Sequence, residues 1–192
     1  MKVGVKRFTY AKYKSGGDGS AIVYENGVMT TDKTVRVEYS TERDDGSFSA
    51  DDHIIDRDNS VIGVTATVEL ATLTKAMAAD ILGWQKVGNT DEYEETEDES
   101  PYIGCGWAFL VKEDGEKKYR GVWIYKIQMG QESDAATTKG ERVEYQTESI
   151  TGSGMGVQLS AGGKIVFRAV MFDCADLSAA ETWLKGKAGI QS

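Results

Sequence analysis

PYIGCGWAFLVKEDGEKKYRGVWIYKIQM, residues 101–129, is the stretch that decides the fold of this chain. It predicts two long strands joined by a tight turn at Asp114-Gly115, because Asp-Gly supplies the positive φ that a short hairpin needs. Apolar side chains alternate on both arms, with Trp107, Phe109 and Val111 on the first and Trp123, Tyr125, Ile127 and Met129 on the second. We expect this hairpin to bury one face, to leave the other free and to carry no chemistry. The pattern indicates a protein whose function lies in its surface and its assembly.

Composition narrows the class of protein. The chain has 192 residues and a formal net charge of −9, and its length fits one domain over residues 1–192. An acidic chain is not expected to wrap DNA, because neutralising phosphates needs clustered Lys and Arg; its acidity suits a surface that must not stick to DNA, or serves solubility alone. The 22 glycines and single proline favour a mainly β fold with many turns. We expect no signal peptide and no membrane partner, because charge precedes any apolar run and no such run is long enough to span a bilayer.

The first 70 residues alternate between polar segments and strands. Residues 1–19 end in SGGDG and predict a flexible N-terminal arm. Residues 34–39 alternate as a half-buried strand, and VIGVTATVEL at 61–70 is a clear one. Between them, residues 40–60 form a long polar segment, which we expect to be a functional loop because structureless inserts of that length are uncommon in compact domains.

Two segments have helical patterns. Residues 73–83 predict a short amphipathic helix with Thr72 or Thr74 as N-cap and Gly83 as C-cap. In the C-terminal part, 173–192, we expect a further turn or two of helix that begins at Ser178, because Glu181 stands three residues on as in a capping box.

The remaining segments predict strands and loops. Residues 142–150 and 164–172 alternate as strands, and TGSGMG at 151–156 predicts a flexible turn between them. The acidic run 91–100 is expected to be a solvated loop, because its spacing lacks the order of an EF-hand calcium site.

Motifs for chemistry are missing from the sequence. His53 is the only histidine, which excludes a multi-histidine metal site, and we expect it in an exposed loop. Cys105 and Cys174 have apolar neighbours and are expected to be buried free thiols. The Gly-x-Gly fragments lack a Walker or dinucleotide context. Apolar neighbours also favour core packing over a sugar platform for four tryptophans: Trp84, Trp107, Trp123 and Trp183. The sequence therefore predicts no catalytic residue, no cofactor and no metal, and a protein that is not an enzyme.

The order of elements resembles a known family. The matching segments are LG at 82–83, PYIG at 101–104, YRGVWIYK at 119–126, TKGE at 138–141 and EYQT at 144–147. Together they span roughly residues 61–152, and they resemble the major tail proteins of long, flexible, non-contractile-tailed phages and prophages of Gram-positive bacteria.

This resemblance implies a fold, a function and partners. The fold is a β-sandwich or barrel-like tail-tube fold, mainly β, with one short helix packed on the sheet and long loops and arms. Copies of the chain form hexameric rings that stack into a hollow tube, whose inner barrel is built from curved sheets. DNA passes through the bore without specific binding. Further partners are tail tip or baseplate, tape-measure and terminator proteins. The protein is located in the virion after synthesis in the host bacterial cytoplasm.

The resemblance also predicts two sets of site residues. Residues 40–60 would form a loop that reaches the adjacent ring, with Asp44, Asp45, Phe48, Asp51, Asp52, Ile54, Ile55 and Asp56 as its assembly residues. Side chains on the polar faces of the strands would line the bore: Glu38, Thr65, Thr67, Glu69, Gln128, Glu144, Gln146 and Glu148. Arg36 and Lys126 do not fit a purely acidic lining, so the faces of their two strands stay open.

Other functions stay open. Within virions, a tail terminator or another component with the tube fold is the nearest alternative. A β-sandwich module that binds carbohydrate or peptide would need exposed aromatic side chains, which the alternation disfavours. A hydrolase that uses scattered carboxylates has no motif to support it.

Overall fold

The computed structural model describes residues 2–44, 46–50, 53–57, 59–113, 115–131 and 147–191. The long strands are β1 (Lys2–Ser15), β2 (Val23–Met29), β3 (Thr34–Arg43), β6 (Val61–Leu70), β9 (Tyr102–Glu113), β10 (Glu116–Gln131), β11 (Glu148–Gly154) and β14 (Arg168–Cys174). They form one antiparallel sheet in the order β2-β1-β9-β10-β11-β6-β3, with β14 added beside β10. The chain is therefore mainly β, as predicted.

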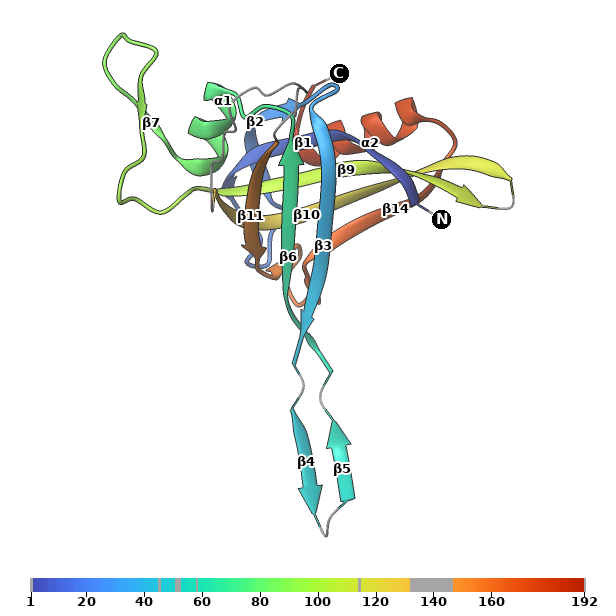
Figure 1. Ribbon diagram of the computed structural model, residues 1–192. Helices are drawn as coiled ribbons and strands as arrows, with labels where there is room; N and C mark the ends of the chain where they lie inside the picture. Colours follow the sequence, from blue (N-terminus) through green and yellow to red (C-terminus); the bar gives the residue numbers. More distant parts are fainter. Residues whose placement is uncertain are drawn as a thin grey trace, which may run out of the picture.

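Smaller elements complete the chain (Figure 1). Three two-stranded pairs lie outside the main sheet: β4 (Ser47–Ala50) with β5 (His53–Arg57), β7 (Gln85–Lys86) with β8 (Tyr93–Glu94), and β12 (Val157–Gln158) with β13 (Ile165–Val166). The helical segments are α1 (Lys75–Met77), which runs on into the π-helical turn η1 (Ala78–Leu82), and α2 (Leu177–Ala188). No described helix is long and apolar enough to cross a membrane.

The β9–β10 hairpin forms as predicted, with Glu113 opposite Glu116 across the turn and Gly115 at a φ of 86°. Its second arm does not keep one face, however. The ladder shifts register between Ile124 and Ile127, because Tyr125 and the next residue form a β-bulge. The single face predicted for Trp123, Tyr125, Ile127 and Met129 is therefore wrong. Trp123 and Tyr125 face one core cluster, whereas Ile127 and Met129 face another.

Both faces of the hairpin are buried, which corrects the prediction of a free face. On one side, β3 and β6 cross β9 and β10 steeply (Figure 1), and Val64 and Val68 share a core cluster with Trp107. On the other side, α2 packs Leu184 against Trp123. The helix therefore covers a second core cluster, which the alternation on the hairpin did not reveal.

The N-terminal segment is not an arm. Residues 2–15 form β1, which pairs with both β2 and β9, and its Phe8 and Tyr10 are buried. Arg7 stands at a register shift in this strand with a φ of 61°, unusual for a residue with a side chain. Its Nε donates to Glu181 of α2 over 2.5 Å, so this bulge ties the helix to the sheet.

The polar segment 40–60 is not a structureless loop. β3 and β6 stay paired as far as Arg43 and Val61, and the Asp44 N–H donates to the Ser60 carbonyl over 2.9 Å. Beyond this point β4 and β5 form a hairpin of their own, which projects from the body of the protein (Figure 1). Their backbone is described, and their side chains lie outside the description.

The helix caps are partly as predicted. Thr74 is the N-cap of α1 and accepts from the Met77 N–H over 3.3 Å, and Gly83 ends η1 at a φ of 79°. Helix α2 is longer than expected. It begins after Asp176, whose Oδ1 accepts from the Ala179 N–H over 2.8 Å, so the predicted cap at Ser178 is wrong.

The C-terminal strands are displaced from their predicted ranges. The segment 151–156, expected to be a turn, lies largely in β11, which ends at Gly154, whereas 142–146 lies outside the described residues. The expected strand 164–172 is split into β13 and β14, which Phe167 separates. Within the acidic run, Tyr93–Glu94 forms β8 against β7.

Candidate assembly surface

One face of β3, β6 and β11 is polar across all three strands. In the ladder Glu38 lies opposite Thr67, and Thr67 lies opposite Thr151. Directly opposed residues of antiparallel strands share a face, so these side chains form one row. A second row holds Ser40, Thr65, Ser153 and Gln128. The other face carries the buried Val64, Ala66, Val68 and Leu70 of β6.

Hydrogen bonds and ion pairs order this polar face. Arg36 pairs with Glu38 of its own strand and with Glu69 of β6, the latter over 3.3 Å. The Thr65 hydroxyl donates to the Glu42 carboxylate. Further along, the hydroxyls of Thr67 and Thr151 lie 3.0 Å apart. These bonds involve three carboxylates, those of Glu38, Glu42 and Glu69, and one guanidinium, that of Arg36. The face is therefore net acidic.

Lys126, the other cation that did not fit an acidic lining, lies elsewhere. It belongs to the bulge of β10, and its Nζ lies 4.3 Å from the ring centre of Tyr13 and 4.6 Å from that of Tyr102. Such cation–π contacts hold an ammonium group against aromatic rings. Lys126 therefore lies away from the polar face, whereas Gln128 of the same strand belongs to it.

Five of the eight predicted bore-lining residues share the polar face: Glu38, Thr65, Thr67, Glu69 and Gln128. Glu148 does not. It lies opposite Leu70, on the core side of the sheet, and its carboxylate accepts from the Leu73 N–H. Glu144 and Gln146 lie outside the described residues.

Several members of this face were not predicted from the sequence, among them Ser40, Thr151 and Ser153. Ser40 continues the alternation of β3, which could have revealed it. Thr151 and Ser153 were hidden because Gly152 and Gly154 made their segment resemble a turn.

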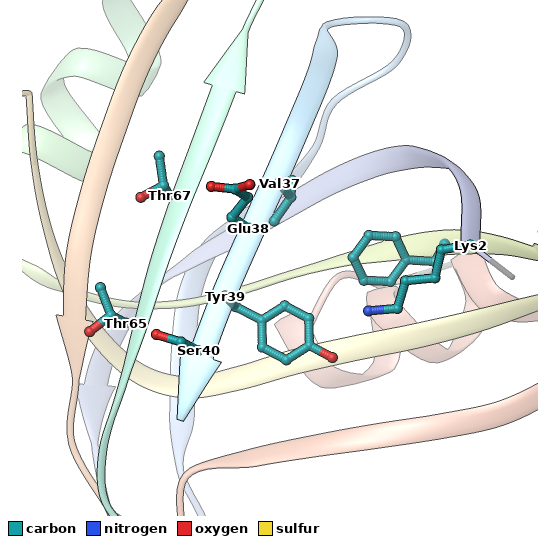
Figure 2. A pocket seen from close by; sticks show the side chains of 8 residues that line it. Lys2, Val37, Glu38, Tyr39, Ser40, Thr65 and Thr67 are labelled. Atoms are coloured by element: carbon teal, nitrogen blue, oxygen red, sulfur yellow. The ribbon is translucent and has the colours of Figure 1, made fainter. Parts of the chain in front are cut away.

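β3 is the last strand of the sheet, and no described strand pairs with its outer edge. A hollow of about 490 Å³ wraps round this edge. Figure 2 shows Glu38, Ser40, Thr65 and Thr67 on one side of β3, and Tyr39 and Lys2 on the other. The Lys2 Nζ lies 4.4 Å from the ring centre of Phe109, so the N-terminus of β1 forms the far wall.

The predicted assembly residues that the structure describes lie on the projecting hairpin or beside it. Asp44 precedes β4, and its Oδ1 accepts from the Gly46 N–H over 3.1 Å. Phe48 belongs to β4, and Ile54, Ile55 and Asp56 belong to β5, together with His53. Asp45, Asp51 and Asp52 lie outside the described residues. Within the described chain, β4 and β5 have only each other as ladder partners.

In the part of the chain that the structure describes, groups for metal chemistry are not brought together. Cys105 and Cys174 are buried free thiols, as predicted, and burial raises the pKa of Cys105 to about 12. Among the described residues no cluster of His, Cys, Asp and Glu could hold a metal ion. Trp107 and Trp123 are fully buried, so neither can serve a sugar platform.

Comparison of the chain with protein-family models and with curated proteins found no match.

Proposed function

We propose that this chain is a structural subunit that assembles with its own copies into a hollow tube, as the major tail protein of a long-tailed, non-contractile phage. The observation that carries the proposal is the β3–β6 strand pair. One face of this pair is polar, its outer edge has no described partner, and its far end runs on into a projecting hairpin. Among the described residues, no group of His, Cys, Asp and Glu that could hold a metal ion competes with this interpretation.

The polar face is suited to line a water-filled bore. Strands around such a bore need polar side chains inward and apolar side chains toward the core, and β6 has this division between Thr65 and Thr67 on one face and Val64 and Val68 on the other. The excess of carboxylates would repel DNA phosphates within a Debye length of about 8 Å at physiological salt. The hydroxyl groups of this face are uncharged, and the positive charge of Arg36 is balanced by Glu38 and Glu69. The face therefore offers no unpaired positive charge that would hold DNA.

The edge of β3 is suited to join neighbouring copies within a ring. A strand of 10 residues with an open edge is a template for pairing with another chain. Val35 of this strand is 50% exposed. In the proposed sandwich or barrel-like assembly, six subunits close a common barrel, and the open edge disappears.

The hairpin is suited to join successive rings. An isolated two-stranded hairpin is only marginally stable in water, and β4–β5 has no described ladder partner outside itself. A neighbouring ring would supply the missing contacts. Tail tip, tape-measure and terminator proteins would then be the partners at the ends and in the bore of the tube.

Electron microscopy of the purified, concentrated protein tests the proposal, with sedimentation velocity on the same samples. Hollow tubes or six-fold rings are expected. Closed assemblies of another symmetry, or a monomer that binds glycans and never forms rings, would refute it.

A further inference from the structure

A second groove lies at the root of the projecting hairpin and has an apolar floor. It has a volume of about 630 Å³ and is lined by the ends of β3 and β6 and by the segment around β13. Ile62 lies on the same face of β6 as the buried Val64 but is 59% exposed, and Ile165 is 65% exposed. Large apolar side chains gathered in one exposed hollow mark a surface that binds another protein.

The groove also lies between two open strand edges. β3 pairs only with β6, and β14 pairs only with β10, within the described part of the sheet. Between them the sheet divides, because β10 pairs with β14 before its bulge and with β11 after it. An extended segment that enters such a gap can add backbone hydrogen bonds to the apolar contacts.

Charge identifies what the groove would accept. Arg43 and Arg168 line it, and its described lining residues include no carboxylate. Glu42, next in the chain to Arg43, bonds Thr65 on the polar face instead. The fitting partner is therefore an extended segment that is both apolar and acidic.

The chain itself contains such a segment. Residues 44–58, DDGSFSADDHIIDRD, combine three large apolar residues with six aspartates and one arginine. Their described strands, β4 and β5, are extended and have open outer edges. Hairpin and groove thus match in conformation, in polarity and in charge.

We infer that the groove between β3 and β14 receives the β4–β5 hairpin of a second copy of this chain. This inference rests on the proposed self-assembly and adds the surface that receives the hairpin. The contact joins two different surfaces of one chain, so it is head-to-tail and can propagate from copy to copy without closing.

Two complementary full-length variants test the contact. The first lacks the hairpin: an Asn-Gly turn replaces residues 45–59, which is feasible because Asp44 and Ser60 are already hydrogen-bonded neighbours. The second keeps the hairpin but carries Ile62→Asp and Ile165→Asp in the groove. Each variant retains one half of the contact, so we expect neither to form tubes alone. When the two are mixed, we expect a one-to-one hetero-complex that neither variant forms by itself, as measured by sedimentation velocity.

Controls separate the contact from misfolding. Adding Ile62→Asp and Ile165→Asp to the hairpin-less chain should abolish the complex, whereas adding Val3→Asp, at a residue with a similar exposure of 54%, should preserve it. Higher salt should weaken the complex, because opposite charges meet in it. Circular dichroism of each variant must match the parent before mixing.

The outcomes also separate this inference from the proposed function. No complex in the mixture overturns the inference, as does tube formation by the groove variant, although tubes would support the proposed function. If the mixture forms a one-to-one complex but the parent chain forms only closed, non-tubular assemblies, the inference is supported and the proposed function is refuted.

Discussion

Gly104 gives the sharpest test of the packing at the centre of the β9–β10 hairpin. It lies opposite the bulge of β10, on the side of the sheet that α2 covers. A Cβ at this position would stand 2.6 Å from Cζ2 of Trp123 and 2.6 Å from Cε1 of Tyr24. Neither ring can easily move. Trp123 is fully buried and its Nε1 donates to the Tyr24 hydroxyl over 3.2 Å, and that hydroxyl donates to the Tyr125 carbonyl over 2.6 Å.

Gly104→Ala should therefore destabilise the protein. Overpacking a well-packed core costs about 1–3 kcal/mol. The loss of backbone freedom in the unfolded chain offsets about 0.4–1 kcal/mol of this. The expected net loss is about 1–2 kcal/mol, which corresponds to a fall in Tm of about 2–8 °C for a domain of this size.

Differential scanning calorimetry and urea unfolding measure this loss, with Gly130→Ala as the matched control. Gly130 is an exposed residue of β10 with no atom within 4 Å of a built Cβ, so its substitution should leave stability nearly unchanged. Trp123→Phe removes Cζ2, and the double variant should lose less stability than the two single losses combined. A Gly104→Ala chain no less stable than Gly130→Ala would refute the reasoning.

Three further predictions follow from the sheet and the hairpin. Replacing 45–59 by Asn-Gly should leave a folded chain with the parent's circular dichroism that forms no tubes by electron microscopy; tubes of normal length would contradict the role given to the hairpin. Glu38→Lys with Glu69→Lys should leave assembly intact but slow DNA ejection, because the polar face becomes cationic; unchanged ejection kinetics would exclude this face from the bore. Burial raises the pKa of Cys105 from 9.0 to about 12 and that of Tyr10 from 10.0 to about 12. Both groups ionise more readily in the unfolded chain, so stability should be full below pH 9.0 and fall as the pH rises toward 12; urea midpoints that stay flat over this range would contradict their burial.

Local signals predicted the hairpin and the first helix well. Asp114-Gly115 specifies a tight turn, and Thr74 and Gly83 specify helix ends, because each acts through neighbouring backbone groups. The bulge after Ile124 could not be predicted in this way. The bulge lies where β10 changes its partner from β14 to β11 while it stays paired with β9. The alternation of apolar residues within β10 carries no information about these partners.

Polar composition predicted loops at two places where the chain forms strands instead. β1 was expected to be an arm because of its polar residues and its SGGDG end, yet it pairs with β9, about one hundred residues further along the chain, and its Phe8 and Tyr10 are buried. The aspartates and serines of 40–60 likewise suggested a loop, although this segment contains β4 and β5, which pair with each other beyond the end of the β3–β6 ladder. On β6 the polar face was predictable, because alternation alone assigns Thr65 and Thr67 to it, whereas Glu148 of β11 was assigned to it wrongly. Its ion pairs around Arg36 needed the register.

The direction of the hairpin determines how the body would carry a pulling force. β4 and β5 prolong β3 and β6 (Figure 1), so tension applied at the hairpin runs along these two strands. Ladder hydrogen bonds in antiparallel sheets lie perpendicular to the strands. The seven residue pairs between β6 and β11 are therefore loaded in shear, all together, and do not open one after another as in peeling. In the proposed tube, an end-to-end pull would accordingly separate copies at their contacts before any single subunit unravels.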